Sequence, residues 1–257
     1  MRTLLSDTAL VFGRYARQTL RSKAAMTFGA LMPVLYLVLY GPLLTDMPLG
    51  GGAGSSWQVL VPGLLLQLAL FGASFAGMGL IIEKQHGIVD RMRVTPVSRL
   101  ALLLGRVLKD AALLTAQAVV IVLVAVAMGL RAPLPGVLLG FAFTAALALS
   151  LAALSYTLAM KAAAPMSFAP LVNTATMPTM LLSGLLLPMS LAPGWLDTLS
   201  HVMPLRYLVD AVRAAFVGHY SDPALARGAL TALILMAVSV AAGARYFRGA
   251  GGGTSQR

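Results

Sequence analysis

Long runs of apolar residues dominate this chain and alternate with short polar or glycine-rich breaks. A helix needs roughly 20 apolar residues to cross the ~30 Å hydrocarbon core of a bilayer, and several runs reach that length. The runs lack the regular apolar–polar alternation of strands in an outer-membrane barrel. We therefore predict an all-α polytopic membrane protein with six transmembrane helices, near 24–42, 57–82, 111–130, 134–160, 166–190 and 224–244.

The first 23 residues precede the first apolar run and have a different pattern. At 100° per residue, Leu5, Phe12 and Tyr15 share one face of a helix. Such a helix lies in the membrane interface, with its basic side toward headgroups or a partner. Residues 1–23 are predicted to form this amphipathic interface helix, and an anchor that only sets topology is the alternative. The opposite, charged face carries Asp7, Arg14, Arg17 and Arg21.

A charged segment, residues 83–99, interrupts the apolar pattern between the second and third spans. We interpret it as a short helix that lies flat at the membrane face and offers a soluble surface to a partner. The apolar side chains of Ile88, Val89 and Met92 would enter a groove on that partner.

Three charges stand close to the predicted membrane boundary. Glu83 ends the second span, where it either pairs with a basic residue of the interface helix or remains a solvated charge. Arg106 and Asp110 are four residues apart at the start of the third span. At that spacing they share one helical face, and we expect them to neutralise each other.

Residues 188–223, between the fifth and sixth spans, are too charged to cross a membrane and too apolar for an exposed loop. Arg206, Asp210 and Arg213 share one helical face, where a carboxylate can bridge two guanidiniums. We predict an external re-entrant hairpin of two short helices, a structure that needs protein around its turn. Its role is either an external gate or structural support. The candidate gate residues are Trp195, Arg206, Tyr207, Asp210 and Arg213.

The fifth span combines polar side chains with prolines and adaptable methionines. Prolines free backbone carbonyls that hydroxyl groups can bond, and methionine suits varied apolar cargo. This span is the candidate transport pathway, although serine and threonine also join membrane helices without any such role. The pathway candidates are Asn173, Thr174, Met177, Met180 and Ser183.

The formal net charge of +11 invites a nucleic-acid interpretation, which the distribution of the 19 Lys and Arg residues opposes. With six spans, only four of them fall on the outside, and the remainder share the side that holds both termini. This asymmetry predicts cytoplasmic termini in a bacterial cytoplasmic (inner) membrane. The basic residues then serve topology and contact with membrane lipids. The four on the outside are Arg131, Arg206, Arg213 and Arg227.

Several kinds of chemistry are excluded by what the sequence lacks. There is no cysteine, so disulfides and thiolate ligands are impossible. The spans hold no carboxylate or histidine cluster for catalysis, and no mid-span ionisable residue suits a proton-coupled carrier. No Gly-x-x-x-x-Gly-Lys-Ser/Thr loop is present to bind nucleotide phosphates. We predict a protein that is not an enzyme and that receives its energy from a partner.

Two segments of this chain resemble the signatures of type-2 ABC exporter permeases, including the daunorubicin-resistance type. The first contains Glu83, Gly87, the Thr-Pro-Val-Ser-Arg stretch at 95–99, and Gly105. The second runs from Leu182-Ser183-Gly184 through Pro193-Gly194-Trp195-Leu196 to Pro204-Leu205-Arg206-Tyr207, followed by Asp210 and Arg213. The order and spacing of these motifs extend the resemblance over nearly the whole chain.

The resemblance implies a cytoplasmic coupling helix near 86–94 and a permease homodimer with two copies of an ABC ATPase subunit. ATP and Mg would be bound by that ATPase, with no cofactor in this chain. Many relatives carry a Glu and paired leucines where this chain has Asp90-Arg91-Met92, which suggests a more basic docking contact. The residues implied in docking are Glu83, Gly87, Ile88, Val89, Asp90, Arg91 and Met92.

From these observations we divide the chain into the interface helix 1–23, a six-helix permease domain 24–248 and a flexible cytoplasmic tail 249–257. The predicted function is the permease subunit of an exporter for hydrophobic or amphipathic molecules, drug-like or lipid-like. A permease for polysaccharide or lipid-linked glycan is the alternative within the family, but only 7% of residues are aromatic. A membrane scaffold that transports nothing is the alternative from another class.

Overall fold

The computed structural model describes residues 4–21, 23–44, 55–87, 99–162, 164–186 and 189–249. Within these ranges every regular element is a helix, and none is a strand. The helices are α1 (Leu4–Arg21), α2 (Lys23–Leu44), α3 (Ser56–Ser74), α4 (Ala76–Gln85), α6 (Arg99–Ala127), α7 (Leu134–Lys161), α8 (Pro165–Leu182), a 3-10 turn (Met189–Leu191), α9 (Gly194–Ser200), α10 (Pro204–Val217) and α11 (Pro223–Gly249).

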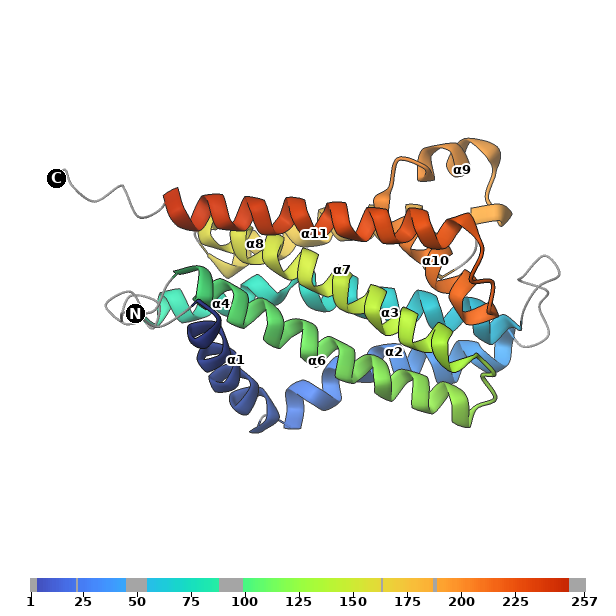
Figure 1. Ribbon diagram of the computed structural model, residues 1–257, viewed down its shortest axis with the longest axis horizontal. Coiled ribbons are helices and arrows are strands. Elements are labelled where there is room, and N and C mark those ends of the chain that lie inside the picture. Colours follow the sequence, from blue (N-terminus) through green and yellow to red (C-terminus); the bar gives the residue numbers. More distant parts are fainter. Residues whose placement is uncertain are drawn as a thin grey trace.

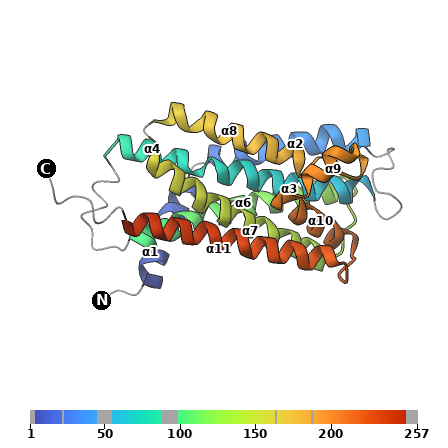
Figure 2. The same cartoon turned by 90° about the horizontal axis from the view of Figure 1, so that it is seen from above.

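The long helices lie side by side along one direction, and consecutive ones run in opposite senses (Figures 1 and 2). One end of this bundle carries α1, the last turn of α4 and the first turn of α6, and we call it the α1 end. The other carries α9 and α10, and we call it the α9 end. Two separate sets of polar side chains gather at these ends.

Four helical stretches are long and apolar enough to cross a membrane. They are Ser56–Gln85, which joins α3 and α4, and Leu100–Ala127, Leu134–Lys161 and Pro223–Gly243. The expected polytopic all-α protein is therefore confirmed. The remaining two of the six predicted spans, α2 and α8, do not meet that criterion in the described residues, and their crossing stays a prediction.

Two predicted boundaries were wrong. The helix of the third span begins at Arg99, and its membrane-long apolar stretch at Leu100, instead of near 111, because the charges at the start of α6 have partners within the bundle and need no solvent. The fifth span was expected to extend to 190, but α8 ends at Leu182. The chain then turns at Gly184, whose φ of 68° is in the left-handed region that glycine adopts most easily.

The core of the bundle is α3, which α2, α6, α7 and α10 surround. Every residue of α3 from Val59 to Leu70 is buried, and Leu64, Leu65 and Leu66 are fully so. A helix that is apolar on all sides belongs inside a bundle, and α3 satisfies this rule.

The helix α10 enters the bundle at the α9 end and packs against α7 and α11 (Figure 1). Its backbone passes so close to α7 that a Cβ added at Gly136 would lie 2.0 Å from the carbonyl oxygen of Ala215. The predicted hairpin of two short helices is therefore present as α9 and α10, with the second helix held inside the protein. The buried face of α10 consists of Leu205, Leu208, Val209, Ala211, Val212, Ala215 and Phe216.

Two glycines of the same predicted span provide a test of this packing. A Cβ at Gly63 would lie 1.7 Å from the carbonyl oxygen of Leu185, whereas a Cβ at Gly79 meets nothing within 4 Å. We expect Gly63→Ala to lower the free energy of unfolding by about 1–3 kcal/mol through overpacking. The matched control Gly79→Ala should be neutral or stabilise by up to about 1 kcal/mol. Thermal unfolding in detergent, followed by circular dichroism, measures both; equal melting temperatures would contradict the packing.

Candidate functional site

A buried arginine at the α1 end joins three helices. The Nη2 atom of Arg106 on α6 lies 2.6 Å from Oε2 of Glu83 on α4. The same atom donates a hydrogen bond of 2.7 Å to the Tyr15 hydroxyl on α1. The Tyr15 hydroxyl in turn donates to the same Glu83 oxygen at 3.3 Å. The guanidinium also stacks over the Tyr15 ring, 5.1 Å from its centroid, in cation–π geometry. We call Tyr15, Glu83 and Arg106 the α1-end triad.

Burial makes these contacts strong. The side chain of Arg106 is 7% exposed and that of Glu83 is 25% exposed. A guanidinium in such a place needs an acid, because unpaired charge in a low-dielectric interior is costly. Burial also raises the pKa of Tyr15, although the Arg106 charge opposes that shift, so the hydroxyl keeps its proton and remains a donor.

The amphipathic character of α1 explains how Tyr15 reaches this position. Thr8, Val11 and Tyr15 lie one turn apart and are buried. Gly105 of α6 allows the close approach, since a Cβ there would lie 2.6 Å from Cγ1 of Val11. The predicted amphipathic helix is thus present, and its place at the membrane interface stays a prediction. Asp7, which we expected on the charged face, is buried with Thr8.

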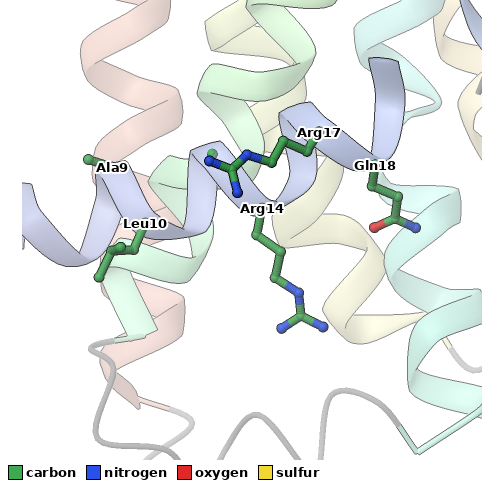
Figure 3. Close-up of a pocket in the computed structure, with 6 residues that line it drawn as sticks. Ala9, Leu10, Arg14, Arg17 and Gln18 are labelled. Carbon is green, nitrogen blue, oxygen red and sulfur yellow. The ribbon is translucent and has the colours of Figure 1, made fainter. Parts of the chain in front are cut away.

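The outer face of α1 carries the predicted basic residues. Arg14 and Arg17 are exposed, and Figure 3 shows Arg14 and Gln18 projecting from the helix into an open pocket along it. The side chain of Arg21 lies outside the described residues. The residues lining this pocket on α1 are Ala9, Leu10, Gly13, Arg14, Arg17 and Gln18.

The triad continues into a second pair of contacts one turn further along α6. Asp110 pairs with Lys109 and accepts a 2.5 Å hydrogen bond from the Tyr156 hydroxyl of α7. The expected pairing of Arg106 with Asp110 is therefore wrong. Arg106 pairs with Glu83 of α4, whereas Asp110 binds Lys109 and the Tyr156 hydroxyl of α7, and the i, i+4 spacing alone could not reveal this.

Glu83 is the first of the predicted docking residues and stands three residues before the predicted coupling helix near 86–94. After α4, Gly87 has a φ of 69°, and its N–H donates to the Lys84 carbonyl, so the helix ends with a left-handed glycine. Beyond it, Ile88, Val89, Asp90, Arg91 and Met92 lie outside the described residues. Glu83 of the α1-end triad stands five residues before Ile88 in the sequence.

At the α9 end, the predicted gate residues do not form the expected bridge. Arg206 lies 2.7 Å from Oδ1 of Asp197 on α9, and its Nε is 3.8 Å from Oδ2 of Asp210. Arg213 makes no ion pair with Asp210, so the proposed Arg–Asp–Arg bridge is wrong. The sequence interpretation missed Asp197, although this acid in an apolar stretch was a usable signal.

Arg213 instead binds the main chain of two other segments. Its Nη2 donates to the Gly184 carbonyl at 2.8 Å and to the Leu185 carbonyl at 3.4 Å, and its Nε donates to the Val59 carbonyl at 3.4 Å. These carbonyls belong to the turn after α8 and to the start of α3. One guanidinium, with its five donors, therefore ties α10 to both.

The remaining two gate candidates lie at the rim of the α9 end. The Tyr207 hydroxyl of α10 donates a hydrogen bond of 3.0 Å to the carbonyl of His201, the residue that follows α9. Trp195 is 70% exposed, which suits a contact with solvent or membrane rather than a closed gate.

The predicted pathway residues do not gather around one cavity. On α8, Asn173, Thr174 and Met177 are exposed and Met180 is half-buried against the core, whereas Ser183, directly after α8, is buried. Hydroxyls along α8 donate to the carbonyl one turn earlier, as Thr174 does to Pro170 at 2.8 Å. Their pathway role stays a prediction, and it requires that the exposed face of α8 meets another surface.

Sequence reasoning also missed two polar residues of α7. Ser155 and Tyr156 are 3% and 4% exposed, and both hydroxyls bond to other helices. The signal available was a Ser-Tyr-Thr run inside an otherwise apolar span. No group of three His, Asp or Glu residues in the described parts of the chain could hold a metal ion.

A double-mutant cycle tests the α1-end triad. Removing one partner of a buried ion pair strands the other, so we expect Glu83→Gln or Arg106→Gln to lower the free energy of unfolding by about 2–4 kcal/mol. The double variant should lose clearly less than the sum. Lys84→Gln, at an exposed neighbour of Glu83, is the control. Additive losses in thermal or urea unfolding would show that the pair is not coupled.

The carbonyl contacts of Arg213 give a second test. Arg213→Met keeps the volume and removes the donors, and leaving buried carbonyls unsatisfied costs about 1–3 kcal/mol. Arg227→Met on the exposed start of α11 is the control, and no change is expected there. Similar melting temperatures for both variants would contradict the anchoring role of Arg213.

Comparison with known proteins shows which family this chain belongs to. Residues 7–217 match the family model described as "ABC-2 type transporter". Among the relatives, a putative transport permease ycf38 of Cyanophora paradoxa is 26% identical over 200 residues, covering 76% of this chain and 69% of the relative. The probable doxorubicin resistance ABC transporter permease protein DrrC of Mycobacterium tuberculosis is 24% identical over 220 residues, covering 84% and 79%.

A third relative, the probable multidrug ABC transporter permease YbhR of Escherichia coli K12, is 23% identical over 194 residues, covering 75% of this chain and 52% of that protein. The family model spans both the α1-end triad and the α9–α10 hairpin. Membership implies an integral membrane subunit without catalysis that works with an ATPase subunit. The chain belongs to the ABC-2 type transporter family and is a transmembrane permease subunit.

Proposed function

We propose that this permease exports hydrophobic or amphipathic molecules, drug-like or lipid-like, when a separate ATPase subunit hydrolyses ATP. The observation that carries the proposal is the α1-end triad. It joins α1 to the short helix α4 and the long helix α6 at the start of the segment predicted to dock on the ATPase. A push on that segment acts first on Glu83, and through Arg106 and Tyr15 it reaches α6 and α1.

The proposed assembly contains two copies of this chain and two ATPase subunits, which bind ATP and Mg. It lies in a bacterial inner membrane with both termini in the cytoplasm, so the α1 end faces the ATPase. The basic outer face of α1, with Arg14 and Arg17, would then face headgroups or the ATPase. The α9 end faces outward, and Arg206 and Arg213 hold it closed.

The proposed cargo class has two supports. DrrC and YbhR are named as doxorubicin-resistance and multidrug permeases, respectively. The face of α8 that carries Asn173, Thr174 and Met177 is exposed in a single copy and mixes apolar with weakly polar groups. Two such faces around a dimer axis would form a pathway that tolerates varied amphipathic molecules.

Reconstitution with an ABC ATPase subunit that co-purifies with this chain tests the proposal. We expect doxorubicin, as a probe, to stimulate ATP hydrolysis and to move across the membrane of proteoliposomes. Glu83→Gln should leave the complex assembled but slow transport about tenfold, which corresponds to a barrier higher by about 1.4 kcal/mol. Gly87→Pro should abolish coupling, because proline cannot adopt the positive φ of that position.

The matched control is Lys84→Gln, next to Glu83 and exposed, which should transport normally. A complex that assembles but neither transports a panel of amphipathic probes nor responds to them would refute the exporter proposal. Normal transport by Glu83→Gln would refute the role of the triad while leaving the cargo class intact.

A further inference from the structure

The second predicted span is broken in its buried interior. The helix α3 ends at Ser74 and α4 begins at Ala76, and Phe75 between them has φ −90° and ψ −1°. No proline stands at this break. The N–H of Met78 bonds to the Phe75 carbonyl at 3.0 Å, so the Ser74 carbonyl loses the partner that a continuous helix would supply.

One hydroxyl from a neighbouring helix satisfies the break. Oγ of Ser155 on α7 donates to the Ser74 carbonyl at 2.6 Å and accepts from the Gly77 N–H at 2.9 Å. Ser74 and Ser155 are 8% and 3% exposed, so solvent does not reach this site in the described chain. The hydroxyl therefore takes both backbone groups that the interruption leaves free.

Contact between α4 and α7 at this point is close. A Cβ at Gly77 would lie 2.5 Å from the Ser155 carbonyl oxygen and 2.8 Å from Cβ of Ala159. The first turn of α4 therefore has no room to move nearer to α7. Ten residues long, α4 extends about 15 Å from this contact to its other end.

Near that other end lies Glu83 of the α1-end triad, so the polar contacts of α4 include the Ser155 hydroxyl at its start and Arg106 near its end. Between them Leu80 and Ile81 are buried, and α4 packs against α7 and α8. We propose that Ser155 is a positioning residue that forms the fulcrum of α4. The ten-residue helix turns about the Phe75 break as a rigid lever, and it transmits movement of the docking segment to the core of the bundle. This inference rests on the proposed function.

Rotation of a 15 Å lever by about 20° moves its end by about 5 Å, a change that spin-label distances resolve. The chain has no cysteine, so Lys84→Cys and Leu134→Cys supply the only thiols. Both positions are exposed, the first near the end of α4 and the second at the far end of α7. Double electron–electron resonance on the full chain in lipid nanodiscs then reports the position of α4.

We expect Ser155→Ala to widen the distance distribution by about 5 Å. Ser150→Ala is the matched control, because that buried hydroxyl bonds only to Ala146 in its own helix, and it should leave the distribution unchanged. Ser155→Thr keeps the hydroxyl and should restore the narrow distribution. An unchanged distribution in Ser155→Ala overturns the proposal, as does failure of Ser155→Thr to restore it.

The second measurement uses the complex with the ATPase. Ser155→Ala should reduce probe-stimulated ATP hydrolysis about fivefold with assembly intact, while Ser150→Ala and Ser155→Thr stay near the unsubstituted rate. If Glu83→Gln is uncoupled and Ser155→Ala is not, the fulcrum is refuted and the proposed function stands. If Glu83→Gln is also coupled normally, the coupling route itself is refuted, whatever the distances show.

Discussion

A single buried guanidinium organises the α1 end of this permease. Arg106 enters the apolar bundle from the first turns of α6, and the low-dielectric surroundings require a carboxylate beside it. Glu83 supplies the charge and Tyr15 supplies a ring face and a hydroxyl. Because the three side chains come from α6, α4 and α1, one electrostatic requirement sets the angle at which α1 docks and the place where α4 ends. The segment after Gly87 starts from that position.

Arginine has a different task at the α9 end. Arg213 binds main-chain carbonyls of the turn after α8 and the start of α3, while Arg206 binds carboxylates of α9 and α10. Carbonyls at helix ends lack partners within their own helix, and buried ones need a donor from elsewhere. The α9 end is thus anchored through backbone that side-chain movement does not easily release. The α1 end depends instead on the ion pair between Glu83 and Arg106.

The helix α7 connects these two regions. It contacts α3, α4, α6, α10 and α11, and so touches helices at both ends of the bundle. Its polar residues mark the places of contact. Tyr156 bonds to Asp110 on α6, Ser155 bonds to the break between α3 and α4, and Gly136 allows the close approach of α10. In a helix that is otherwise apolar, each of these small or polar residues corresponds to a specific neighbour.

The sequence by itself determined the class of this protein, because the length of an apolar run, the amphipathic period of residues 4–21 and the absence of a phosphate-binding loop are local properties. It also located the α9–α10 hairpin from residues too charged to span and too apolar to be exposed. Only the tertiary structure decided the partners. Arg106 pairs with Glu83 rather than Asp110, and Arg213 binds carbonyls rather than Asp210. A buried charged side chain pairs with the polar group that lies nearest to it in space. Helix packing sets the distance between the two groups, and their spacing in the sequence does not.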